Sequence, residues 1–259
     1  MKATAIEFRL RMLINMVIIV FGFNAQGSPL WNAITGAPLQ ASLIEWLPLQ
    51  LSRAGIAPFA AAVPAVIVLA SGLAGIAAIL RVWGSAWLGP GTVLNAKMKA
   101  HDVMAGGPYR YVRNPLYIGV WCMVAALAFL MTPIGALVTM VLITFFQFRL
   151  ILGEEAFLAR QLRAPYQDYL RAVPRLIPRL HTLLPPSTEK PEWMRAFLTE
   201  LTPIGIFIAI AVVSWRFDYM LMARTILVVF GISLVVRAIM PKAANPASPL
   251  SGSSSSLPE

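Results

Sequence analysis

The sequence predicts an all-α fold, a polytopic integral-membrane helical bundle of about six spans with a central helical hairpin. Composition is the first reason: 58% of the 259 residues are hydrophobic and only 12% are charged, whereas soluble domains carry roughly 25% charged residues. The mean hydropathy of +0.73 is the second. The third is a long apolar run from Ile118 to Phe146 that contains no charged residue.

Each apolar run is assigned by its length and by the residues that interrupt it. The first, Leu10 to Phe23, lacks a small-residue cleavage site, and we interpret it as a retained span rather than a secretory signal. The run 117–148 exceeds the roughly 20 residues that a bilayer requires. Near its middle, Thr132-Pro133-Ile134-Gly135 predicts a tight turn between antiparallel helices. Arg216-Phe217-Asp218 divides the last run. The predicted spans are 7–24, 56–80, 116–131, 134–150, 201–216 and 220–240.

The basic residues predict the orientation of these spans. Of the 21 lysines and arginines, only Arg53, Arg216 and Arg224 lie elsewhere than in the segments of one side. The other 18 fall in the segments 1–11, 81–115, 149–200 and 237–259, which six spans place together on the opposite side. The positive-inside rule assigns that side to the cytoplasm. We therefore expect a multi-pass protein of the cell (inner) membrane with both termini in the cytoplasm.

Two polar clusters flank the apolar hairpin and would meet at one membrane surface. The first follows the Gly106-Gly107-Pro108 turn, which either exposes backbone N–H groups to an anion or is a plain turn. Within it, Pro115 is expected to open a helix with Asn114 as its cap. Arg113 beside that helix start favours negative charge, either of a ligand or of a lipid phosphate.

The second cluster is Glu154-Glu155. Adjacent residues of a helix point about 100° apart, so these carboxylates cannot act as a close pair. Either one faces a site, or both lie on a solvated helix end. His101, His181 and Cys122 offer no ligand set at metal spacing, so no metal is expected. Basic residues cluster beside apolar spans, which indicates contact with lipid headgroups and not with nucleic acid.

The ordered combination of motifs resembles the isoprenylcysteine carboxyl methyltransferase family, to which phospholipid N-methyltransferases are related. It comprises Gly-Pro-Tyr-x-x-x-Arg-Asn-Pro-x-Tyr at 107–117, the apolar hairpin, Glu-Glu-x-x-Leu at 154–158, Tyr166-x-x-Tyr169 and Val173-Pro174-Arg175-x-x-Pro178. The resemblance covers about 95–180. It implies an integral-membrane methyltransferase that uses S-adenosylmethionine, without a Rossmann domain, in a pocket on the cytoplasmic face.

The resemblance also implies residue roles. The positions that match cofactor-contacting stretches are His101, Asp102, Val103, Met104, Tyr109, Asn114, Pro115, Leu116, Tyr117 and Glu155. We assign catalytic roles to Arg113, Glu154 and Arg149. Asn114 stands where the family has a histidine, and Arg149 lies about one position from the family's substrate-directing arginine.

The expected acceptor is lipidic or a small apolar molecule, with carboxylate O-methylation as the leading prediction. A carboxylate acceptor requires no general base. Phospholipid or amine N-methylation is the alternative, and it requires a base such as Glu154 or His101 to take a proton from the ammonium. A non-catalytic membrane scaffold or a transporter is the alternative from another class, although the central spans lack the mid-membrane ionisable groups typical of transporters.

The predicted organisation has four parts. Residues 1–94 form the N-terminal membrane spans, and 95–185 form the methyltransferase core with its hairpin and cytoplasmic segment. Residues 186–242 form a C-terminal membrane hairpin. The Pro- and Ser-rich tail 243–259 is expected to be disordered.

Overall fold

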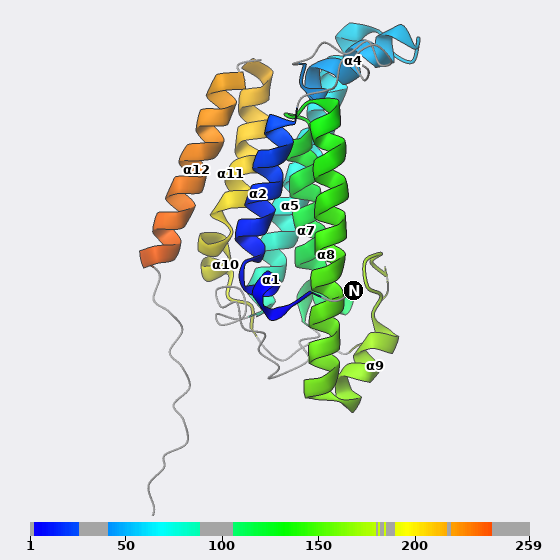
Figure 1. Cartoon of the computed structure of the whole chain (residues 1–259), viewed down its shortest axis with the longest axis vertical. Helices are drawn as coiled ribbons and strands as arrows, with labels where there is room; N and C mark the ends of the chain where they lie inside the picture. The colour runs from blue at the N-terminus through cyan, green and yellow to red at the C-terminus, as the bar shows by residue number, and fades with distance from the viewer. Residues whose placement is uncertain are drawn as a thin grey trace, which may run out of the picture.

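The computed structural model describes residues 3–25, 41–88, 106–179, 181, 184, 190–216 and 219–239. Every regular element within these ranges is helical (Figure 1), which confirms the all-α prediction for the described part of the chain. The predicted tail 243–259 lies outside the described residues.

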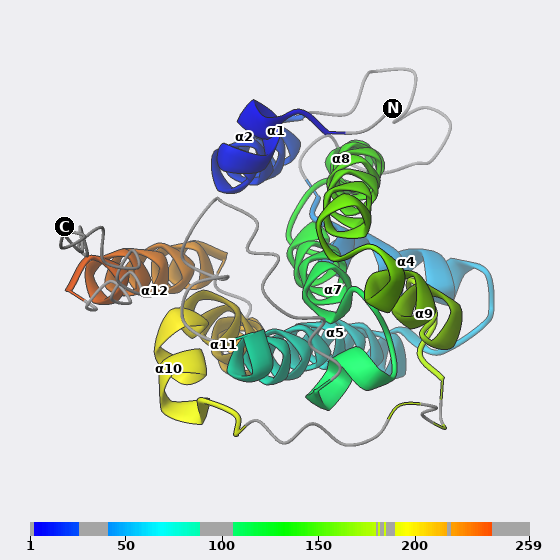
Figure 2. The same cartoon turned by 90° about the horizontal axis from the view of Figure 1, so that it is seen from below.

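A row of long helices forms the bundle. Its members are α2 (Arg11–Asn24), α5 (Phe59–Leu88), α7 (Pro115–Ala128), α8 (Pro133–Leu162), α11 (Leu201–Ile208) and α12 (Tyr219–Ile239). α11 continues through the π-helical turn η2 (Ala209–Val213) and the short 3-10 helix η3 (Ser214–Arg216). Seen from below, α7 lies between α5 and α8, with α2 beyond α8 and α11 and α12 beyond α5 (Figure 2). These helices lie at the six places in the chain where the sequence predicts spans.

Fewer helices of the described residues are long enough to cross a membrane than the six or so spans predicted. Two helices, α5 and α8, are long and apolar enough to cross a membrane, or three if the bent pair Trp193–Thr199 and Leu201–Arg216 is one span. α2 and α7 have 14 residues each. At 1.5 Å per residue each measures about 21 Å, which is shorter than the roughly 30 Å hydrocarbon core of a bilayer. Apolar composition alone therefore overcounted the spans.

The central hairpin consists of α7 and α8, and it turns where the sequence predicts. α7 ends at Ala128, and Thr132 caps α8 by accepting a hydrogen bond from the Gly135 N–H at 3.2 Å. α8 then runs 30 residues without a break, past residue 150, where the predicted membrane span ends. It ends before α9 (Ala164–Ala172), because Pro165 in the first turn of α9 cannot continue the α8 hydrogen bonds.

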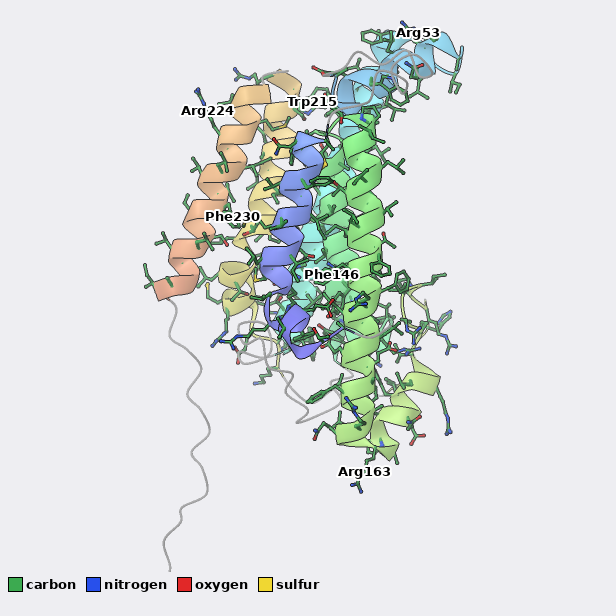
Figure 3. The ribbon with its side chains drawn as sticks, in the orientation of Figure 1. Arg53, Phe146, Arg163, Trp215, Arg224 and Phe230 are labelled. Carbon is green, nitrogen blue, oxygen red and sulfur yellow. The ribbon has the colours of Figure 1, made fainter. Side chains whose placement is uncertain are left out.

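The short helices gather at the two ends of the bundle. α1 (Ala5–Arg9), α9 and α10 (Trp193–Thr199) lie at one end, together with the 3-10 helix η1 (Gly107–Arg110), and α4 (Leu43–Arg53) lies at the other (Figure 1). Figure 3 places Arg53 and Arg224 at the α4 end and Arg163 at the α9 end. The two polar clusters of the sequence consequently share one end of the bundle, as predicted.

A close crossing holds α2 against α8. A Cβ atom on Gly135 would collide with the Gly22 carbonyl oxygen, and one on Gly22 would collide with the Thr139 side chain. Close backbone approach through small residues is a usual way for helices to pack within membranes. Nearer the α1 end, the Gln147 amide donates to the Asn15 side chain at 3.3 Å. These contacts fix the start of α2 beside the end of α8 that carries the glutamates.

Candidate functional site

Glu155 on α8 is the centre of a buried cluster of charged hydrogen bonds. Arg113 Nη1 donates to its Oε1 at 3.0 Å. Arg175 donates from Nε to both oxygens at 3.1 Å and from Nη2 to Oε2 at 2.7 Å. The Asn114 amide adds a longer bond to Oε1 at 3.4 Å. Two guanidiniums therefore occupy one carboxylate, the bidentate geometry that makes such pairs strong.

Backbone contacts bind the same three segments together. The Arg113 N–H donates to the Pro174 carbonyl at 2.9 Å, and Arg113 Nε donates to the Val173 carbonyl at 2.7 Å. The Asn114 amide donates to the Arg175 carbonyl at 3.1 Å. The chain leaving α9 is thus joined to the start of α7 across about 60 residues of sequence. The hydrogen bonds that Arg175 donates to Glu155 also raise the pKa of the Arg175 guanidinium.

Asn114 occupies the expected N-cap position of α7, but its side chain makes no capping hydrogen bond. The amide turns instead to Glu155 and to the Arg175 carbonyl. Pro115 is the first helical residue, as predicted. The expectation that the Asn114 side chain caps the helix is therefore wrong, because the buried carboxylate and carbonyl compete for its donors.

Glu154 has different surroundings from its neighbour. Its Oε2 accepts a hydrogen bond from the Tyr117 hydroxyl at 2.8 Å. Among the described residues, no arginine, lysine or histidine lies within 4.0 Å of its oxygens. The Arg11 guanidinium acts on it only at longer range. The two adjacent carboxylates thus point to separate places: guanidiniums neutralise Glu155, whereas no cation of the described residues neutralises Glu154.

Tyr109 lies buried against α5. Its hydroxyl has no hydrogen-bond partner among the described residues, while its carbonyl accepts from the Tyr169 hydroxyl at 3.0 Å. A Cβ on Gly84 of α5 would lie 3.4 Å from the Tyr109 hydroxyl and 2.7 Å from Leu116 Cδ2. Burial raises the pKa of Tyr109 well above its ordinary value. The Tyr109 hydroxyl is therefore a neutral hydrogen-bond donor without an acceptor among the described residues.

The glycine turn before Tyr109 packs directly on the indole of Trp87. A Cβ on Gly106 or on Gly107 would collide with this ring, and Gly107 also has a φ of +50°. The glycines are required by this close approach as well as by the turn. The Trp87 Nε1 is buried and has no partner among the described residues.

Arg149 belongs to another cluster. Its Nη2 donates to both oxygens of Glu7 on α1 at 2.8 Å, and its carbonyl accepts from the Ala3 N–H at 3.1 Å. The structure therefore joins Arg149 to the N-terminal segment, and brings Arg113, Asn114 and Glu155 together elsewhere. His101, Asp102, Val103 and Met104 lie outside the described residues.

Sequence reasoning assigned no role to several residues of this end of the molecule. One of them is Arg175, and membership of the Val173-Pro174-Arg175 motif was the feature of the sequence that could have indicated its place in the site. Glu200 is fully buried and accepts from Arg81 at 2.9 Å through both Nε and Nη2, and from the Ser85 hydroxyl at 2.5 Å. This pair joins α5 to the junction of α10 and α11. In the sequence, the only indication of this ion pair was the position of Glu200, an acidic residue directly before an apolar run.

The donors of the site fit a ligand that brings acceptor atoms. Tyr109 and Trp87 each present a buried donor without a partner in the described part of the chain, and a carboxylate or ring nitrogen of a cofactor such as S-adenosylmethionine could satisfy them. Among the described residues, no group of three or more His, Cys, Asp or Glu side chains could hold a metal ion.

One family model matches the chain, that of the phospholipid methyltransferases, over residues 65–164. The match begins within α5 and ends at the start of α9, so it includes Arg113, Glu154 and Glu155 and leaves out Arg11 and Arg175. No curated protein and no solved structure matches the chain. Over its α5–α7–α8 core, the chain is therefore similar to the phospholipid methyltransferases, a family of membrane methyltransferases.

Proposed function

We propose that the protein is an S-adenosylmethionine-dependent methyltransferase that methylates the amine nitrogen of a lipid at the cytoplasmic face of the cell membrane. The observation that supports this acceptor is the contrast between the two glutamates. Glu155 has its charge balanced by Arg113 and Arg175. Glu154 has a hydroxyl partner only, among the described residues. The family match over the same helices supports the reaction type.

A carboxylate that no cation among the described residues neutralises favours a cationic ligand. Removal of a charge from water is costly unless an opposite charge compensates for it. A lipid ammonium would compensate for Glu154 directly. An ammonium must also lose a proton before its nitrogen can attack a methyl carbon, and in this proposal Glu154 receives that proton. Tyr117 would hold the carboxylate in one orientation while it does so.

The Glu155 cluster has a supporting role in this proposal. It joins the start of α7, the end of α8 and the chain after α9, and so fixes the positions of Tyr117 and Glu154. When bound, S-adenosylmethionine supplies an electrophilic methyl group. The protein's contribution is then alignment of the acceptor nitrogen and exclusion of water, which can supply several kcal/mol of the barrier reduction. Tyr109 and Trp87 are the proposed cofactor-facing donors, and Glu155 remains a predicted cofactor residue.

O-methylation of a lipid carboxylate is the second candidate. It needs a cation near the acceptor, and the arginines around the glutamates are mostly engaged: Arg113 and Arg175 with Glu155, Arg149 with Glu7. One observation supports this candidate. Arg11 makes no ion pair within the described residues, so its guanidinium could be the cation that a carboxylate acceptor needs.

The test is a labelling experiment with purified protein in nanodiscs. The discs contain phosphatidylethanolamine together with a prenylated cysteine lipid, and the cofactor carries a labelled methyl group. We expect an acid- and base-stable label on the amine lipid. Glu154→Gln keeps an acceptor for Tyr117 but removes the charge, so the rate should fall at least tenfold while cofactor binding persists.

Asp168→Asn is the matched control, because Asp168 is an exposed carboxylate of the same end of the molecule. It should behave as the wild type. A base-labile ester label on the prenylated lipid would replace the amine proposal by O-methylation. No cofactor binding at all would refute both candidates and favour a non-catalytic scaffold.

A further inference from the structure

We propose that Arg11, the first residue of α2, binds the phosphate of the acceptor lipid and so gives the enzyme its preference for phospholipid amines. The proposal rests on the proposed amine methylation and adds a specificity residue to it. Arg11 lies outside the segment 65–164 that matches the methyltransferase family. The N-terminal helix, and not the shared core, would then choose the class of lipid.

The Arg11 guanidinium is held in place by an aromatic ring. Its Cζ lies 4.4 Å from the centroid of the Phe8 ring. Phe8 is buried and belongs to a cluster in which Phe146, Leu150 and Tyr117 also take part. A cation over an aromatic face is attracted by the charge distribution of the ring, and more strongly where water is excluded. The stacking holds the guanidinium over the Phe8 ring but uses none of its N–H donors.

One of these nitrogens, Arg11 Nη1, is buried and has no hydrogen-bond partner within the described part of the protein. Arg113, Arg149 and Arg175, by contrast, each have a carboxylate partner. A buried donor on a charged group is costly when it is left unpaired. A phosphate supplies the missing acceptors in the planar, two-pronged geometry that guanidinium matches best.

Arg11 and Glu154 together present opposite charges that do not touch. Arg11 acts electrostatically on both Glu154 and Tyr117, yet no ion pair joins Arg11 to Glu154 within 4.0 Å. An ammonium linked to a phosphate by two carbons carries one charge opposite to Glu154 and one opposite to Arg11. An amine without a phosphate complements only Glu154, and a free phosphate complements only Arg11.

The position of Arg11 along α2 favours a lipid as the source of the phosphate. Met12, Leu13, Met16 and Val17, which follow it, are exposed apolar side chains. A basic residue at the start of such a helix lies where headgroup phosphates lie in a bilayer. The acyl chains of a lipid bound at Arg11 could extend along this exposed face of α2.

The test compares two acceptors in the complete protein. One is phosphatidylethanolamine and the other is a long-chain primary amine that lacks a phosphate. The Arg11→Gln substitution should lower the ratio of kcat/KM for the phospholipid to kcat/KM for the amine at least tenfold, mainly by raising KM for the phospholipid. Arg11→Lys should restore part of that ratio, because it keeps the charge but loses the planar guanidinium. Arg9→Gln is the matched control and should keep the wild-type ratio, since Arg9 is an exposed cation two residues away.

A binding measurement without cofactor separates this inference from the proposed function. Dihexanoyl-phosphatidylethanolamine should bind the wild type and Arg9→Gln equally, and Arg11→Gln at least tenfold more weakly. This result would support the Arg11 site even if no amine were methylated. Equal binding by Arg11→Gln, or an unchanged acceptor ratio, would overturn it. Inorganic phosphate that bound as tightly as the lipid would refute the lipid assignment.

Discussion

At the scale of single residues, the two adjacent glutamates have opposite environments. The sequence predicted that they point apart, because this follows from helix geometry alone. It could not predict which one would be neutralised. The partner Arg175 comes from a segment that returns to α7 only after α9, and a contact of that kind depends on the tertiary path of the chain.

Tyr117→Phe tests the role of the Glu154 hydrogen bond. The substitution removes the donor that lies 2.8 Å from Glu154 Oε2 and little else. A hydrogen bond to a charged group contributes about 1.5–3 kcal/mol, so we expect kcat to fall by about tenfold or more, with the dissociation constant of the cofactor unchanged. Steady-state kinetics and a cofactor titration measure the two effects.

Tyr111→Phe serves as the control for this substitution, because Tyr111 contacts the ring of Trp83 and belongs to neither glutamate cluster. It should leave kcat near the wild-type value. If both tyrosine variants lost activity equally, the Tyr117 hydroxyl would have no special part in the reaction.

At the scale of elements, the hairpin and the spans differ in how well they could be predicted. Thr132-Pro133-Ile134-Gly135 located the turn, because proline and a capping threonine act locally. The number of full spans was wrong, since hydropathy shows which residues are apolar and not how long the helix becomes. α7 stops after 14 residues because the chain turns between Phe129 and Thr132.

Gly135→Ala tests the crossing of α2 and α8. The added Cβ would collide with the Gly22 carbonyl, and backbone cannot move aside as a flexible side chain does. We expect a loss of stability on the order of 1–3 kcal/mol, as for other overpacked sites. Thermal unfolding in detergent measures it.

Gly72→Ala is the matched control, because nothing lies within 4 Å of a Cβ at this position of α5. An exposed helical alanine should be neutral or stabilising by up to about 1 kcal/mol. A Gly135→Ala protein as stable as Gly72→Ala would show that the two helices do not approach so closely.

At the scale of the whole molecule, the alternation of chain direction is what brings the polar clusters together. The sequence predicted this common end from six apolar runs and from the distribution of basic residues. Figure 3 shows Arg53 and Arg163 at opposite ends of the bundle. The prediction succeeded although several helices are too short to span, because even a short helix reverses the direction of the chain.

The orientation in the membrane can be tested with single cysteines in a Cys122→Ala background. Arg53→Cys and Arg160→Cys place exposed thiols at the two ends. A membrane-impermeant maleimide should label Arg53→Cys in intact cells, and Arg160→Cys only after permeabilisation. The reverse pattern would contradict a cytoplasmic site.

The unbroken length of α8 has a consequence for how the protein meets its membrane. Its 30 residues measure about 45 Å, whereas the hydrocarbon core of a bilayer is about 30 Å thick. Helices adjust to thicker or thinner bilayers by tilting, and a rigid helix that carries Glu154 and Glu155 near its far end transmits that tilt to both carboxylates. Their depth relative to the lipid headgroups is then set by the membrane as well as by the protein. If the protein has the proposed function, the bilayer that provides the acceptor lipid would also adjust the position of the two glutamates.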